Sequence, residues 1–167
     1  MPEETTRRRA MQDLREGKSP STAAGEFVHE EIEHIREGKH GARSPQQAIA
    51  IGLSKARRAG VPLPPPTKGK TSEATRKSAE REYEKGQHGD TKPHSARASR
   101  ARERALEKEP RSSASHRALS KHATSAARKR SSQSRHDAAM KAVRTKGKAG
   151  LRQAAQKAAR TRAKHSA

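Results

Sequence analysis

Apolar residues recur at helical spacing in the first sixty residues of the chain. Val28, Ile32 and Ile35 follow one another at intervals of four and three, with Ala24 and Phe27 beside them. Side chains at these intervals lie on one face of an α-helix. The pattern predicts an amphipathic helix whose apolar face packs against another part of the protein.

A second apolar face is formed by Ile49, Leu53 and Ala56. It follows Ser44 and Pro45, which suit the N-cap and the first position of a helix, and Gln47, which can reach back in a capping box. A helix that begins at this proline is therefore expected.

Glycines and prolines mark where the helices should end. Gly17 and Gly38 each follow an amphipathic stretch and fit the left-handed position after a helix. Ser19 and Pro20 repeat the first half of the capping arrangement, and Gly60 stops the third stretch. We therefore predict helices near residues 4–16, 20–37 and 45–59.

The sequence changes character after residue 60. Val61 is followed by four prolines within residues 62–66, which favours a stiff spacer that acts as a hinge. Beyond it, residues 71–86 and 95–109 have mixed charge and few apolar side chains. Both segments are predicted to be helical, and the second is expected to be a solvated helix.

Large apolar residues are scarce. Leu, Ile, Val and Phe number fourteen, and ten of them precede residue 64. A loose helical hairpin, self-association or folding on a partner is expected rather than a rigid three-helix domain. The predicted fold is all-α, a small helical N-terminal module plus a largely disordered or helix-on-binding basic tail. Its parts are a module at 1–60, a hinge at 61–70, a linker at 71–110 and a tail at 111–167.

Positive charge is concentrated in the tail. The chain has 39 Lys and Arg against 18 Asp and Glu, a formal charge of +21. Residues 1–60 contribute +2, residues 61–110 contribute +4 and residues 111–167 contribute +15. This excess indicates a polyanionic partner.

An internal repeat organises the end of the chain. Residues 138–146 return as residues 154–162, sharing the unit Ala-Ala-x-Lys-Ala-(Val/Ala)-Arg-Thr-(Lys/Arg). Wound as a helix, Lys157, Arg160 and Lys164 share one face and alanines occupy the other. Such a helix should stay frayed in water until phosphates neutralise its charge.

These features predict a non-enzymatic, histone-like protein that binds nucleic acid without sequence preference. Phe27 and Tyr83 are the only aromatic residues, too few for a base-stacking surface, so duplex backbone is the expected target and DNA is favoured over RNA. Basic residues of the tail, and a secondary patch before the hinge, are expected to neutralise the phosphates: Arg128, Lys129, Arg130, Lys141, Arg144, Lys146, Lys148, Arg152, Lys157, Arg160, Arg162 and Lys164, with Lys55, Arg57 and Arg58.

Two other functions stay open. Residues 1–60 could dock a protein partner or dimerise, with the tail as a tether, or the tail could bind ribosomal or other RNA. The chain has no apolar run long enough to span a membrane and no apolar stretch behind its N-terminus. We therefore expect a cytoplasmic, nucleoid-associated protein.

Motifs typical of catalysis or cofactor binding are incomplete. The sequence has no cysteine, which excludes thiolate chemistry. Gly17-Lys18-Ser19 and Gly69-Lys70-Thr71 resemble the end of a phosphate-binding loop, but Gln12 and Pro64 stand where its first glycine is required. No cofactor and no enzymatic activity are predicted.

Histidine and glutamate are frequent in the second predicted helix. His29 and His34 are five residues apart, about 140° around a helix, so they cannot share a metal from one face. No metal site is predicted. The glutamates at positions 26, 30, 31, 33 and 37 are expected to form a solvated acidic face, or alternatively to bind the basic tail and hold it off DNA.

The N-terminal part of the chain resembles a family of small basic bacterial proteins of unknown function. The residues that carry the resemblance are 15–28, 35–44 and 47–60. The resemblance covers roughly the first 66 residues and implies a bacterial cytoplasmic protein, without any activity. The Ala/Lys/Arg repeat is similar in composition to the tails of linker histones and bacterial histone-like proteins, which implies DNA condensation.

Overall fold

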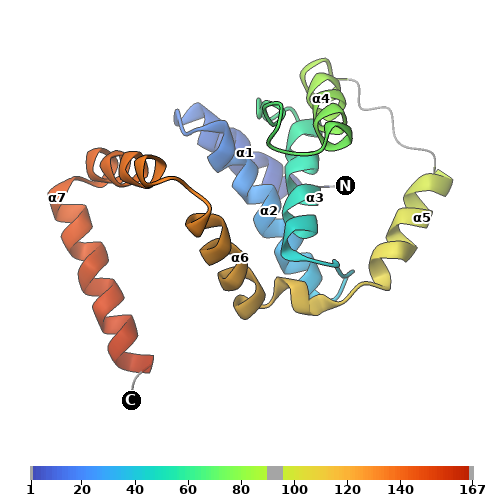
Figure 1. The fold of residues 1–167 in the computed structure, drawn as a ribbon. Helices are drawn as coiled ribbons and strands as arrows, with labels where there is room; N and C mark the ends of the chain where they lie inside the picture. The colour runs from blue at the N-terminus through green and yellow to red at the C-terminus, as the bar shows by residue number, and fades with distance from the viewer. Residues whose placement is uncertain (1, 90–95, 166–167) are drawn as a thin grey trace. The chain divides into compact units, whose positions relative to one another are not determined.

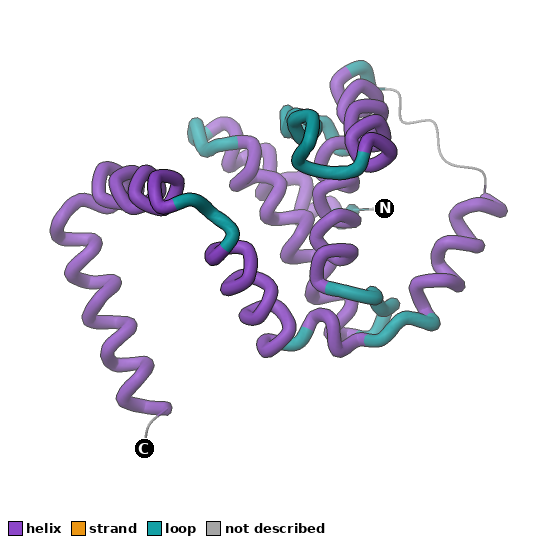
Figure 2. Tube along the Cα trace, viewed as in Figure 1, coloured by secondary structure: helices purple, strands orange, loops and turns teal. Residues whose placement is uncertain are grey.

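The computed structural model describes residues 2–89 and 96–165, and the regular secondary structure of these residues is helical throughout (Figure 1, Figure 2). This agrees with the predicted all-α class. In chain order the elements are α1 (Glu4–Arg15), α2 (Pro20–Glu37), α3 (Pro45–Arg58), α4 (Glu73–Gln87), α5 (Ala96–Glu107), the 3₁₀ turn η1 (Arg111–Ala114), α6 (His116–Arg128) and α7 (Ser132–His165).

The chain divides into two compact units, residues 1–122 and residues 123–167. In unit 1, α2 packs against α1 and α3, and α4 packs against α3 (Figure 1). The turn η1 contacts both α2 and α3. Unit 1 therefore extends well beyond the sixty residues in which most large apolar side chains lie.

The first three helices lie where the sequence predicted them, because their end signals operate as expected. Gly17 and Gly38 have φ of 73° and 83°, the left-handed conformation that glycine adopts without strain. The Ser44 hydroxyl accepts a hydrogen bond from the Gln47 N–H at 3.3 Å, while Gln47 Oε1 accepts one from the Arg43 N–H at 2.8 Å. The Ser19 hydroxyl contacts only neighbouring hydroxyls and does not cap α2 through a backbone N–H.

Small residues make the contact between α2 and α3. Phe27 is fully buried, and Ala24 and Ala56 lie beside it in one core cluster. Gly52 lies against the α2 backbone, where a Cβ atom would approach the Val28 Cα to 2.7 Å. Because alanine and glycine allow helices to come close, the unit forms a core from few large side chains.

A second core cluster joins residues that are far apart in the sequence. Ile35, Ala42, Ala48 and Ala114 are all fully buried in it. The Arg36 Nε–H donates to the Ala114 carbonyl at 3.0 Å, which fixes η1 on the end of α2. Residues 111–114, predicted to begin the tail, thus belong to the folded unit.

The segment after α3 also belongs to the fold. Val61 is fully buried and Leu63 packs against the first core cluster, where the sequence had suggested a hinge. Gly86 lies inside α4, not at its end, and its backbone approaches the Arg57 carbonyl too closely for any side chain. These contacts attach α4 to α3, so residues 61–87 are part of unit 1 and do not act as a free linker.

The predicted helix at 95–109 is observed as α5, and Ser95 lies outside the described residues. The loop after α2 is hydrogen-bonded to the end of α5: the Gly41 N–H donates to the Leu106 carbonyl at 2.9 Å. The Ala42 N–H donates to the Pro110 carbonyl at 3.2 Å. These bonds connect two loops of unit 1 that are about seventy residues apart.

Unit 2 corrects the prediction of a largely disordered tail, because the end of α6 (residues 123–128) and α7 make it helical. No side chain described in residues 123–163 is buried. The helix therefore arises from the high intrinsic propensity of alanine, lysine and arginine and not from packing. Gly147, with φ 64° and ψ 175°, breaks α7 into two helical segments of 15 and 18 residues.

Candidate functional site

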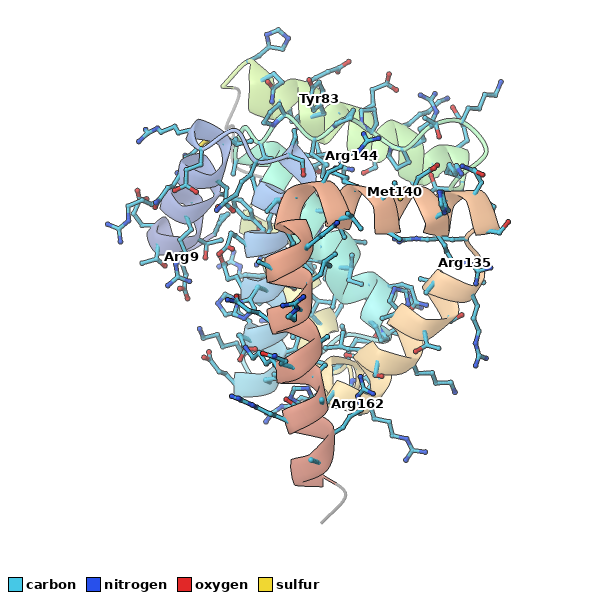
Figure 3. The ribbon with its side chains drawn as sticks, turned by 90° about the vertical axis from the view of Figure 1, so that its left-hand side faces the viewer. Arg9, Tyr83, Arg135, Met140, Arg144 and Arg162 are labelled. Carbon is cyan, nitrogen blue, oxygen red and sulfur yellow. The ribbon has the colours of Figure 1, made fainter. Side chains whose placement is uncertain are left out.

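The predicted nucleic-acid-binding residues of unit 2 lie on the exposed surface of its helices. The described members have exposed side chains: Arg128, Lys129, Arg130, Lys141, Arg144, Lys146, Lys148, Arg152, Lys157, Arg160 and Arg162. The side chain of Lys164 lies outside the described part of the chain. Figure 3 shows Arg135, Met140 and Arg144 on the first segment of α7 and Arg162 on the second.

The two copies of the repeat have the same local structure. The Thr145 hydroxyl donates to the Lys141 carbonyl at 2.9 Å, and the Thr161 hydroxyl donates to the Lys157 carbonyl at 3.0 Å. Each threonine is thus bonded one turn back within its own helix. The repeat consequently presents equivalent basic residues on two helical segments, one on each side of Gly147.

Unit 2 has little negative charge to offset its basic side chains. Residues 123–167 contain thirteen Lys and Arg and one acidic residue, Asp137, giving a formal charge of +12. Asp137 accepts a hydrogen bond from the Gln133 amide at 2.9 Å. With Arg162 left aside, none of the described side chains of unit 2 that were predicted to bind nucleic acid forms an ion pair with a carboxylate of the described residues.

The predicted secondary patch of Lys55, Arg57 and Arg58 is engaged within unit 1 instead. Lys55 Nζ lies 2.6 Å from a carboxylate oxygen of Glu31, and Arg58 Nε lies 3.1 Å from Glu82. Arg57 is buried and donates to the Leu63 carbonyl at 3.2 Å. Burial lowers the pKa of Arg57, and the Glu82 carboxylate partly opposes this shift. These three residues do not form a free cationic surface.

Comparison of the chain with protein-family models, with curated proteins and with solved structures found no match. The resemblance of the N-terminal residues to a family of small basic bacterial proteins stays a prediction. None of the helices in the described residues is both long and apolar enough to cross a membrane.

The predicted acidic face of α2 is not uniformly solvated. Glu30 and Glu31 are buried, with Glu31 fully so. The reason is visible in the register: Phe27, Glu31 and Ile35 are spaced by four and share the face that packs into the core. Lys55 of α3 supplies the opposing charge, at 2.6 Å from Glu31 Oε2 and 3.9 Å from Glu30 Oε1.

Two half-buried histidines and the exposed Glu3 complete the cluster around the buried Glu30 and Glu31. His40 Nε2 lies 3.3 Å from Glu31 Oε1, and His34 Nε2 lies 3.2 Å from Glu3 Oε1. The His34 and His40 rings meet edge to face, with centroids 6.3 Å apart. Hydrogen bonding to His34 lowers the pKa of Glu3, desolvation opposes this shift, and the positive charge of Lys39 lowers the pKa further.

The local fold explains how these residues meet. Glu31 and His34 are three apart on α2 and so share a face. The left-handed Gly38 then ends the helix, with the Lys39 N–H donating to the His34 carbonyl at 2.9 Å, and the chain turns back so that His40 returns beside α2. The spacing of His29 and His34 in the sequence did not reveal this cluster, because its second histidine, His40, comes from the loop after the helix.

Proposed function

We propose that this protein is a non-enzymatic nucleic-acid-binding protein that binds duplex DNA through phosphate neutralisation by unit 2. The observation that carries the proposal is the set of exposed basic side chains on α6 and α7, which have almost no carboxylates to offset them. Each phosphate contact by such a side chain releases condensed counterions from DNA.

The arrangement favours contact with the backbone over reading of bases. The two segments of α7, about 22 Å and 27 Å long at 1.5 Å per residue, carry Lys or Arg at intervals of two to six residues. The alanines between them offer no hydrogen-bond donors or acceptors to base edges. Affinity should therefore be similar for unrelated duplex sequences.

A pair of charge-matched variants of the full chain tests this proposal. Arg128, Lys129 and Arg130 are three exposed basic residues in unit 2, and Arg7, Arg8 and Arg9 are three exposed basic residues in α1. Replacing either set with glutamine lowers the net charge by the same amount. The unit 2 variant should lower the salt slope of log affinity by about 2.7, at roughly 0.9 per lost phosphate contact.

The α1 variant controls for net charge. If binding depended only on the chain's total charge of +21, both variants would lose the same affinity. Equal losses would contradict binding through unit 2. Competition between a random-sequence DNA duplex and a structured RNA then separates the two nucleic acids. If the RNA displaces the DNA duplex from the protein more readily than the DNA displaces the RNA, RNA and not DNA would be the preferred ligand.

A further inference from the structure

In the cluster around Glu31 in unit 1, two hydrogen-bond acceptors face each other with no donor between them. His40 Nδ1 lies 3.0 Å from the Gly41 carbonyl oxygen, which can only accept a hydrogen bond. Nδ1 therefore carries the proton, and in the neutral ring Nε2 presents a lone pair. That lone pair faces Glu31 Oε1 at 3.3 Å, and this carboxylate oxygen is fully buried with no hydrogen-bond donor among the described residues.

Two acceptors that face each other in a buried site require a cation between them. We propose that Glu31, His34 and His40 bind a divalent transition-metal ion of the zinc class. One ligand atom from each of the three residues lies within 4.8 Å of the others. Imidazole nitrogens together with a carboxylate oxygen are ligands that zinc and related ions bind in proteins.

The distance between His40 and Glu31 suits such an ion. In a tetrahedral site with metal–ligand bonds of about 2.0 to 2.1 Å, neighbouring ligand atoms are about 3.3 Å apart. The His40 Nε2 to Glu31 Oε1 distance has this value. The Gly41 carbonyl that accepts from Nδ1 is also the kind of partner that orients a metal-bound histidine.

The charge of the surroundings suits a divalent ion as well. Glu3, Glu30 and Glu31 supply three carboxylates and Lys55 supplies one ammonium group, while Lys39, 3.7 Å from Glu3, is offset by Glu37 at 3.0 Å. With neutral histidines the cluster has a formal charge of minus two. Lys55 pairs with Glu31 Oε2 and leaves Oε1 for the metal, so the lysine neutralises one oxygen without occupying the site.

Titration of the metal-stripped full chain with Zn²⁺ by calorimetry tests the proposal. The matched variants are His40→Gln, which keeps the Glu31–Lys55 ion pair, and His29→Gln, which removes an exposed histidine from α2. Wild type and the His29→Gln variant should bind one equivalent, while the His40→Gln variant should bind on the order of tenfold or more weakly. Co²⁺ should give tetrahedral absorption bands that the His40→Gln variant lacks.

Thermal unfolding supplies a readout that does not depend on the titration. Zn²⁺ bound to the folded chain should raise the Tm of wild type and of the His29→Gln variant, but not that of a His34→Gln/His40→Gln variant. Equal Zn²⁺ affinity of wild type and the double variant would overturn the proposal. That result would mean that a proton on the His40 imidazole, and not a metal ion, lies between His40 and Glu31.

Discussion

Single residues decide how closely the helices of unit 1 approach. Gly25 and Gly52 are both interior helix positions, on α2 and α3, but their surroundings differ. Nothing lies within 4 Å of a Cβ atom at Gly25, whereas a Cβ at Gly52 would press on the backbone of α2 at Phe27 and Val28. The same substitution should therefore have opposite effects at the two sites.

Gly52→Ala should lower the free energy of unfolding by about 2 kcal/mol, because backbone on both sides prevents relaxation. Gly25→Ala should raise it by about 0.5 to 1 kcal/mol, since alanine removes the entropy cost of helical glycine. Urea denaturation of both full-length variants measures the two changes. A stabilised Gly52→Ala variant would show that α2 and α3 are not in close contact.

Lys55 matters because of the carboxylate it faces. Lys55→Met would remove the ammonium group that lies 2.6 Å from the fully buried Glu31 carboxylate. We expect a loss of roughly 3 kcal/mol in the free energy of unfolding. Lys18→Met provides the comparison: Lys18 pairs with Asp13 at 2.6 Å, but on the exposed surface, so its loss should be smaller.

The double variant Glu31→Leu/Lys55→Met separates the ion pair from the packing around it. Replacing both charges with apolar groups should recover most of the stability lost in Lys55→Met. Chemical denaturation of the single and double variants makes the comparison. If the double variant is as unstable as the single one, the loss comes from packing of the lysine stem and not from the uncompensated carboxylate of the buried Glu31.

At the scale of elements, two serines that precede a helix differ in whether they cap it. Ser44 and Ser19 both precede a proline at the start of a helix, but only the Ser44 hydroxyl accepts a hydrogen bond from the backbone of its helix. Ser44→Ala should reduce the free energy of unfolding by about 1 kcal/mol. Ser19→Ala should cost distinctly less, and equal losses would argue against the cap at Ser44.

The first three helices could be predicted from the sequence because their signals are local. Caps, terminal glycines and apolar spacing act within a few residues, and α1, α2 and α3 begin and end close to the predicted positions. The buried cluster could not be predicted in the same way. Glu31 shares a face with Phe27 and Ile35, which is a readable signal, but its partner Lys55 lies on another helix and His40 comes from a loop.

The buried face of α3 shows the limit of a periodic pattern. Ile49, Leu53 and Ala56 were predicted to face the core. Ala48, Gly52, Ala56 and Arg57 are the buried residues of α3, while Ile49 and Leu53 are half-buried and Leu53 packs against the first core cluster. Large side chains gave the stronger pattern in the sequence. The close approach of two helices instead selects the smallest residues for the contact.

At the scale of the whole molecule, the two units use the same residue types differently. In unit 1 the alanines fill the core between helices and basic side chains such as Lys55 and Arg58 are paired with carboxylates. In unit 2 the described alanines are not buried, and the helices carry exposed basic groups. Total composition pointed to disorder for most of the chain because it does not distinguish these two uses of alanine.

Long-range contacts also determine where the folded unit ends. Ala114 is buried beside Ile35 and Ala48, and Arg36 bonds to its carbonyl. A boundary drawn from the loss of large apolar residues after position 64 therefore falls too early. The compact unit continues to residue 122.

The salt dependence of binding tests the central proposal most directly. Full-length protein and a chain ending at residue 122, which keeps both core clusters, are titrated against a random-sequence DNA duplex at several salt concentrations. If about ten basic residues of unit 2 reach phosphates, log affinity of the full chain should fall with log salt at a slope near −9, and the shortened chain should bind far more weakly. Equal affinity and slope for the two chains would contradict the assignment of DNA binding to unit 2.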